Sequence, residues 1–203
     1  MKIESVLKAG NRMDRFTVMF EDGTEIKVSS VQLADYGIYS GLELSDDEYA
    51  QLQKDVESST SKARAVRILG SRNLSAREME RRLVNKGESE STARGTVEWL
   101  ENIGAVNDEE YAVAIVKHYC AKGYGFARIR DELFRRGIPR DMWDDALREA
   151  GNAEEAAHAY LAKKLRGSRE KDDIRRAADA LCRRGFSYEQ ARAAISIYLD
   201  NNE

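Results

Sequence analysis

A short pattern that occurs three times constrains the fold of this chain more than any other feature. In each copy an apolar residue stands four positions before a leucine, and a basic residue and a glycine follow. The copies begin at Met79, Ile129 and Ala177 and end at Gly87, Gly137 and Gly185, so the glycines are separated by 50 and 48 residues. A nearly constant period of this length indicates tandem supersecondary units.

Each copy has the features of a helix that ends at the glycine. Residues at i and i+4 lie on the same helix face, so the two apolar residues point to one side. A basic residue in the last turn interacts favourably with the helix dipole, and a glycine after that turn adopts the left-handed conformation that ends a helix. Gly87, Gly137 and Gly185 are therefore expected to have positive φ angles.

Apolar spacing predicts one further helix before and one after each of these central helices. The upstream helices are indicated by Ala65, Ile68 and Leu69, by Tyr111, Ile115, Val116 and Tyr119, and by Tyr160, Leu161 and Leu165. The downstream helices are expected at 93–100, 142–150 and 189–199, and the N-cap signals are Ser75 with Glu78, Asn107 and Ser187. The expected fold is mainly α: three three-helix units (62–104, 105–150 and 151–203) that stack into a curved, elongated tandem array.

The first 61 residues have a different pattern and are expected to form a small N-terminal extension of a β-hairpin and helices. Phe16, Val18 and Phe20 alternate with polar residues, and a two-residue Asp22-Gly23 turn leads into a second strand at 25–28. Residues 2–7, followed by Gly10-Asn11, are a candidate third strand. Helices are expected at 31–36 and after Ser45, which forms a capping box with Glu48. Residues 58–61 are either a linker or the next helix cap.

Composition and charge narrow the class of protein. Charged residues make up 34% of the chain and there is one proline, a balance typical of exposed helices. The net charge of −3 combines an acidic first segment, with six basic and twelve acidic residues in 1–61, and a mildly basic remainder. Apolar runs stay well short of the about 18 residues that a membrane helix needs, and a cleavable leader pattern is missing, so a cytoplasmic protein without a membrane partner is expected. Cys120 and Cys182 are expected to be buried reduced thiols.

Reactive groups do not converge in the sequence. Nucleotide-loop, zinc-protease and serine-hydrolase motifs are missing, and His118 and His158 fall in different units without a metal-ligand partner nearby in sequence. The Asp144-Asp145 pair points in two directions on a helix, and Gly123-Tyr124-Gly125 is interpreted as an inter-helix turn. We therefore expect a protein that binds a macromolecule, with neither catalytic activity nor a cofactor or metal ion.

Basic residues gather at related places in the three units and are the candidate binding residues. They are Arg77, Arg81, Arg82 and Lys86, then Lys122, Arg128, Arg130, Arg135 and Arg136, and finally Arg175, Arg176, Arg183 and Arg184. The alternative interpretation is a solvated surface balanced by Glu78, Glu80, Asp131, Glu132 and Asp173. Recurrence favours a shared binding surface, because corresponding positions of a repeat array line one side. Arginines near helix ends, including Arg135, Arg136, Arg183 and Arg184, are expected to be exposed.

Longer motifs around these residues are similar to those of the RecX family, bacterial regulatory proteins of the RecA recombinase. The first two units carry Arg72-Asn73-Leu74-Ser75, Glu78-Met79, Leu83, Lys86-Gly87, Asn107-Asp108, Tyr111-Ala112, Lys122-Gly123-Tyr124-Gly125, Arg128-Ile129-Arg130, Glu132-Leu133 and Arg136-Gly137-Ile138. The third unit matches through Tyr160, Lys164, Leu165, Leu181, Arg184, Gly185, Phe186 and Ala191. The resemblance covers about residues 62–200.

The resemblance implies a monomeric modulator that binds the RecA filament on single-stranded DNA and limits strand exchange and ATP hydrolysis by RecA, in homologous recombination, DNA repair and the SOS response. Because the net charge is −3, contacts with protein are expected to outweigh direct contacts with DNA. Two alternatives are a double-stranded DNA-binding protein and a helical scaffold for other proteins. No single predicted helix combines the Arg, Asn and Gln residues suited to reading bases.

Overall fold

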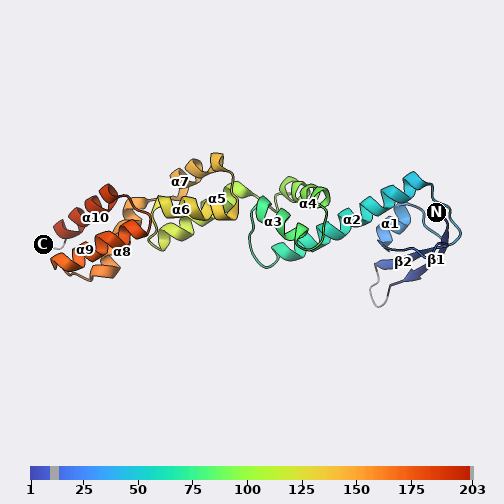
Figure 1. Cartoon of the computed structure of the whole chain (residues 1–203), viewed down its shortest axis with the longest axis horizontal. Helices are drawn as coiled ribbons and strands as arrows, with labels where there is room; N and C mark the ends of the chain where they lie inside the picture. Colours follow the sequence, from blue (N-terminus) through green and yellow to red (C-terminus); the bar gives the residue numbers. More distant parts are fainter. Residues whose placement is uncertain (10–13, 202–203) are drawn as a thin grey trace. The chain divides into compact units, whose positions relative to one another are not determined.

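The computed structural model describes residues 1–9 and 14–201, and over these ranges the chain is mainly helical with a small N-terminal sheet (Figure 1). This class agrees with the prediction. The chain divides into two compact units, Met1–Ser71 with Leu83–Thr96 and Arg72–Arg82 with Val97–Glu203. The division of residues 62–203 into three units with the expected boundaries stays a prediction.

The sheet consists of three antiparallel strands in the order β1 (Ile3–Lys8), β2 (Arg15–Phe20) and β3 (Glu25–Ser29), so the hairpin and the third strand are confirmed. The loop between β2 and β3 differs from the expected two-residue turn. The Phe20 amide donates to the Thr24 carbonyl at 2.9 Å, which leaves three residues in the loop, and Gly23 has a φ of +85°. A three-residue hairpin loop places a left-handed residue at this position. The Gly10-Asn11 turn lies outside the described residues.

The sheet packs against α1 (Ser30–Asp35) and α2 (Asp46–Leu69) around one apolar cluster. Leu52 of α2 is fully buried in this cluster. The capping box of Ser45 and Glu48 is confirmed, since Ser45 Oγ accepts from the Glu48 amide and the Glu48 carboxylate accepts from the Ser45 amide. Because α2 continues without interruption through residues 58–61, the linker and cap interpretations of that segment are both wrong.

Two shorter helices follow, α3 (Ala76–Val84) and α4 (Glu90–Asn102), and the division between the compact units falls inside both of them. In the N-terminal unit the rear half of α2 contacts α4 through a buried polar pair. The Thr96 hydroxyl donates to Ser61 Oγ at 2.9 Å, and both side chains are buried. The capping box of Ser75 and Glu78 is confirmed.

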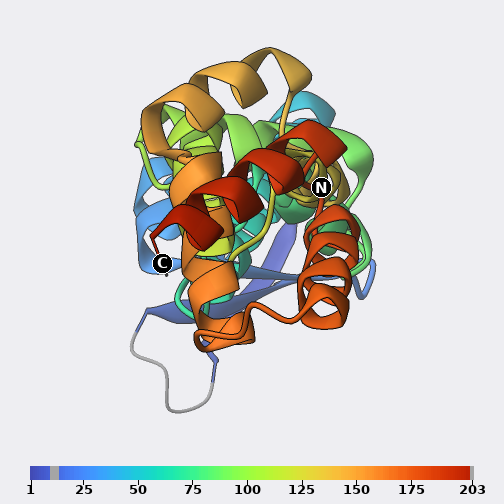
Figure 2. The same ribbon diagram turned by 90° about the vertical axis from the view of Figure 1, so that its left-hand side faces the viewer.

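The C-terminal unit contains two sets of three helices. The first set is α5 (Asp108–Ala121), α6 (Phe126–Arg136) and α7 (Trp143–Ala150). A short 3₁₀ turn, η1 (Arg140–Met142), comes directly before α7. The second set is α8 (Ala153–Leu165), α9 (Lys171–Arg183) and α10 (Tyr188–Asp200). The helices of the second set contact one another pairwise, and Figure 2 shows α10, in red, crossing α8. The predicted N-caps Asn107 and Ser187 are confirmed.

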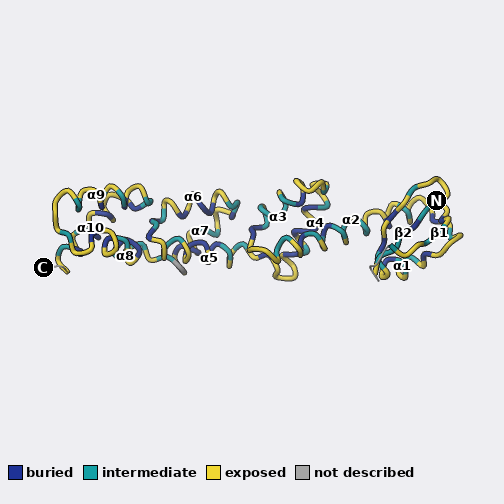
Figure 3. Tube along the Cα trace, turned by 90° about the horizontal axis from the view of Figure 1, so that it is seen from below, coloured by how far each residue is buried: buried dark blue, intermediate teal, exposed yellow. Residues whose placement is uncertain are grey.

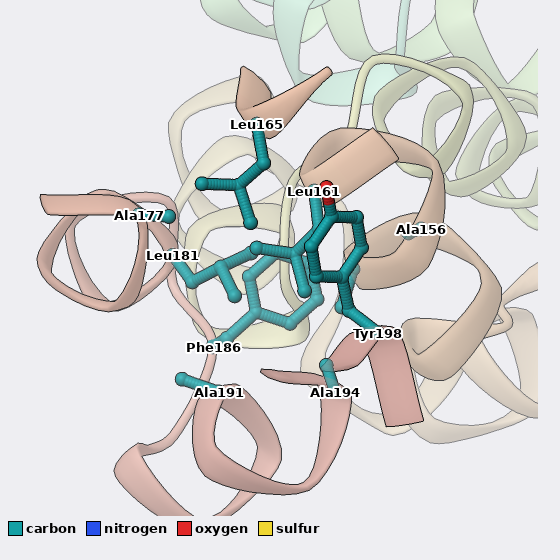
Figure 4. Close-up of a cluster of buried hydrophobic side chains, with 10 residues drawn as sticks. Ala156, Leu161, Leu165, Ala177, Leu181, Phe186, Ala191, Ala194 and Tyr198 are labelled. Atoms are coloured by element: carbon teal, nitrogen blue, oxygen red, sulfur yellow. The ribbon is translucent and has the colours of Figure 1, made fainter. Parts of the chain in front are cut away.

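Each of the two sets encloses its own apolar cluster. In the second set Leu161, Leu181 and Phe186 point towards a common centre, with Tyr198 beside them (Figure 4). Buried and exposed positions alternate along these helices, which is the pattern of amphipathic helices (Figure 3).

Several other sequence predictions have a clear outcome. Gly87, Gly137 and Gly185 have φ angles of +93°, +75° and +90°, so the left-handed helix ends are confirmed. The prediction of buried thiols is wrong for Cys182, which is exposed, and Cys120 is half-buried. The side chain at Cys182 points outward because it follows Leu181, which occupies the core position. Among the described helices, none combines the length and apolar character needed to cross a membrane.

Candidate functional site

Four of the candidate basic residues, Arg77, Arg128, Arg136 and Arg184, lie at two places where helices of the C-terminal unit meet end to end. At the junction of α6 and α9, the start of α6 lies against the end of α9. The amide of Gly125 donates to the Arg184 carbonyl at 2.9 Å, and the amide of Ala127 donates to the Gly185 carbonyl at 3.2 Å. The first amides of a helix have no partner within it. Here the carbonyls of Arg184 and Gly185, which directly follow α9, supply the acceptors.

The junction of α3 and α6 has the same arrangement with different groups. The Ser75 hydroxyl, at the start of α3, donates to the Arg136 carbonyl at the end of α6. The carboxylate of Asp108 accepts from the Ala76 amide at 2.9 Å. Both junctions bring the positive end of one helix dipole to the negative end of another, an attractive arrangement.

Close approach at these junctions is one reason why the second and third copies of the repeated pattern end in glycine. A Cβ at Gly185 would stand 2.4 Å from the Arg128 amide nitrogen, and one at Gly125 would stand 2.3 Å from the Gly185 carbonyl oxygen. A Cβ at Gly137 would stand 2.6 Å from Cδ of Arg77. At Gly87, in the N-terminal unit, it would meet nothing within 4 Å. Position 87 thus requires glycine only because the backbone is left-handed there. Positions 137 and 185 also require it because a side chain would clash with the neighbouring helix.

Arg136, the basic residue before Gly137, is held by contacts within the protein. Its Nε donates to Glu132 Oε1 at 2.8 Å, its Nη1 donates to the Tyr111 hydroxyl, and its guanidinium lies 5.6 Å from the centre of the Tyr111 ring. Glu132 is buried and also pairs with Arg135, so it is the kind of buried carboxylate that requires compensation. Burial raises the pKa of Tyr111, and the charge of Arg136 opposes that shift.

Arg184, the corresponding residue before Gly185, is held in another way. Its Nη1 donates to the carbonyls of Lys122 and Gly123 at 2.9 and 3.3 Å. Its guanidinium lies 4.8 Å from the ring centre of Tyr124 and 4.4 Å from that of Tyr160. The expectation that all four paired arginines are exposed is therefore wrong for Arg136 and Arg184, which are half-buried because they connect neighbouring helices.

Most of the remaining candidates on α6 and α9 have acidic neighbours on the surface. The ion pairs are Arg128 with Asp131 at 3.9 Å, Arg130 with Asp144 at 3.0 Å, Arg175 with Asp172 at 3.6 Å and Arg176 with Asp173 at 2.8 Å. A hydrogen bond from Ser168, helped by Arg176, lowers the pKa of Asp173. Exposed pairs of this kind contribute little to stability, so these arginines can exchange their partners for an external anion.

In the part of the chain that the structure describes, the charges of the other candidate residues are not neutralised by a neighbouring carboxylate. Over residues 1–9 and 14–201, no carboxylate forms an ion pair with Arg77, Arg81, Arg82, Lys86, Lys122 or Arg183. When the three patterns are aligned on their glycines, Arg135 corresponds to Arg183, and Lys86 corresponds to Arg136 and Arg184. The same alignment pairs Arg77 with Arg175 and Arg128 with Arg176. Among the candidates, only the position just before the glycine is basic in all three units, so the recurrence is narrower than the sequence suggested.

Sequence reasoning missed two basic residues beside this site. Lys163 and Lys164, in the last turn of α8, line a recess together with Lys122 and Arg184. The signal available in the sequence was the pair of adjacent lysines just before the buried Leu165.

Comparison with known proteins gives a consistent result. A family model described as "RecX, second three-helix domain" matches residues 107–147. A regulatory protein RecX from Xanthomonas axonopodis pv. citri is 31% identical over 141 residues, which cover 68% of this chain and 87% of that protein. The chain belongs to the RecX family. Another RecX, from Pseudomonas putida, is 30% identical over 135 residues, covering 65% of this chain and 86% of that protein.

Solved RecX structures show the same fold. A crystal structure of regulatory protein RecX superposes with a TM-score of 0.71 at 20% identity, covering 94% of this chain and 97% of the other. RecX from Lactobacillus salivarius superposes with a TM-score of 0.62 at 23% identity, covering 69% and 95%. The relatives are named regulatory proteins, so the family assignment places this chain in a regulatory class.

Proposed function

We propose that this chain binds the RecA filament on single-stranded DNA and inhibits the recombinase and ATPase activities of RecA. Membership of the RecX family, through a relative that matches 68% of the chain, is the observation that carries this proposal. The chain itself catalyses no reaction and acts as a monomer in the cytoplasm.

The distribution of charge supports this function. Arg135 and Arg183, at corresponding positions on α6 and α9, both project into solvent. A nucleoprotein filament presents DNA phosphates and protein carboxylates, and both attract such groups. Because the two positions belong to successive stacked sets, one molecule can make the same contact at two points along a repeating partner.

The test measures ATP hydrolysis by RecA on single-stranded DNA, with the chain present well below one copy per RecA monomer. The wild-type protein should lower the rate while hydrolysing no ATP alone. The double variant Arg135→Gln/Arg183→Gln should inhibit less, and it should remain folded because Glu132 keeps its pair with Arg136, and Arg184 keeps its own contacts. Lys54→Gln/Lys117→Gln, which removes two exposed positive charges elsewhere, is the matched control.

Two outcomes would contradict the proposal at different levels. A wild-type protein that leaves the RecA rate unchanged would exclude the inhibitory function, and duplex DNA binding in its place would favour the double-stranded DNA alternative. Full inhibition by the double variant would remove the basic residues from the mechanism.

If about six phosphates are engaged, log affinity for bare single strands should fall against log salt with a slope near −4.

A further inference from the structure

A recess with a strongly basic lining lies between the α5–α6 loop, α8 and the end of α9. Its volume is about 280 Å³, and Lys122, Lys163, Lys164 and Arg184 line it together with the ring of Tyr160. None of the lining residues is acidic. We call these four basic residues and Tyr160 the junction pocket.

The fold holds the guanidinium of Arg184 in a fixed position in the junction pocket. Nη1 donates to two backbone carbonyls, and the group stacks on the rings of Tyr124 and Tyr160. Within the described part of the chain, Nε and Nη2 of Arg184 have no acceptor. An arginine whose fork is already positioned loses little freedom when those remaining donors bind an anion.

Close packing brings the loop that carries Lys122 against α8. Gly123 has a φ of +73°, and a Cβ there would stand 3.1 Å from Cβ of Tyr160. A larger residue would push the loop and its lysine away from Lys163 and Lys164. The pocket is therefore a product of the stacked helices rather than of one helix surface.

The charges in the junction pocket are not neutralised by the protein. Across the described ranges, Lys122, Lys163 and Lys164 form no ion pair. Lys164 is a minor contributor to the lowered pKa of Asp173, but that carboxylate is already paired with Arg176 and Ser168. Like charges gathered in a recess repel one another, and a bound anion removes this repulsion.

We propose that the junction pocket binds a phosphodiester group of single-stranded DNA. The remaining donors of Arg184 and three mobile lysine ammonium groups suit the oxygens of a phosphate. The recess is smaller than typical small-molecule pockets, so it accommodates the backbone of a strand while the bases stay outside. This inference rests on the proposed function in one respect, because the single-stranded DNA would be the strand within a RecA filament.

The direct test measures binding of a fluorescent oligothymidylate without RecA, by anisotropy at several salt concentrations. Lys163→Gln/Lys164→Gln should weaken binding roughly tenfold, the size of one lost contact to a charged group, and should make the salt slope shallower by about 0.7. The matched control is Lys54→Gln/Lys117→Gln, which removes two exposed charges elsewhere and should bind like wild type. Lys122→Gln provides a second pocket variant with the same expected direction.

Competition identifies the ligand. Oligothymidylate should displace the probe far better than inorganic phosphate or polyglutamate at equal charge concentration. Equal competition by inorganic phosphate would make the free ion the ligand, and equal competition by polyglutamate would point to an acidic protein surface; either result overturns the proposal. A pocket variant that binds the strand like wild type overturns it as well, as does a wild-type protein without measurable affinity.

Inhibition of RecA by the same variants separates this inference from the proposed function. Weak strand binding by the pocket variant with full RecA inhibition would support the pocket and assign the inhibitory contact to protein. A wild-type protein that binds strands through the pocket but leaves RecA unaffected would refute the inhibitory function alone.

Discussion

The two helix junctions of the C-terminal unit perform the same task with different chemistry. Where α6 meets α9, backbone amides donate directly to backbone carbonyls, and glycine is present on both sides. Where α3 meets α6, side chains of Ser75 and Asp108 replace part of this backbone pairing. The first arrangement requires closer approach of the two chains than the second.

This difference shows that the repeated sequence pattern encodes the stacking of neighbouring helix sets as well as the end of a helix. The residue before the glycine is a tether at both junctions, through Arg136 and Arg184, while the residue before that tether is exposed. Adjacent arginines therefore differ in their surroundings, since one is held by partners within the protein and the other faces solvent.

The largest expected effect comes from placing alanine at the glycines. Gly185→Ala combines a left-handed backbone with a clash against the Arg128 amide, so it should lower the free energy of unfolding by about 3 kcal/mol. Gly87→Ala has a similar φ and no neighbour, so it should cost about 1 kcal/mol. Urea denaturation of both variants gives the comparison. Equal losses would show that the α6–α9 junction places no steric demand on the glycine.

A smaller effect is expected from the tethering arginines. Arg136→Gln removes a charged partner from the buried Glu132 and should cost about 2 kcal/mol. Arg135→Gln removes the more exposed of the two partners of Glu132 and leaves the Arg136 pair intact, so it should cost less, about 1 kcal/mol. The pair Arg184→Gln and Arg183→Gln repeats the comparison at the other junction. Thermal unfolding measures all four, and indistinguishable members of each pair would refute the division between tether and exposed residue.

The smallest expected effect is a pH dependence of stability that arises from Asp108, a residue of the α3–α6 junction alone. Burial raises the pKa of Asp108 above 3.8, although the hydrogen bond from Ala76 opposes the shift and Glu78 adds to it. The folded state therefore holds this proton more tightly than the unfolded state does. Its contribution is most favourable below pH 3.8 and declines as pH rises through the raised pKa. The stability of wild type relative to Asp108→Asn should therefore fall as pH rises through this range, in unfolding measured at each pH, and a constant difference would contradict the assignment.

Local sequence rules predicted the secondary structure and the helix ends because caps and glycine turns depend on neighbouring residues. Ser45, Asn107 and Ser187 cap the helices expected of them. The tethering of Arg136 and Arg184 was not predictable in this way, because their partners Tyr111 and Lys122 lie 25 and 62 residues away in sequence. Recurrence alone does not distinguish a tether from a binding residue, and Lys163 joins the basic recess only through tertiary packing.

The uninterrupted helix α2 also limits how this protein can change length during evolution. Leu52 faces the apolar cluster under the sheet and Ser61 faces Thr96 of α4, so the two ends of one helix serve different neighbours. Each inserted or deleted residue would turn one end relative to the other by about 100°. An insertion of about seven residues, close to two full turns, would restore the phase. Relatives that retain both contacts are therefore expected to vary in this segment by near-whole turns.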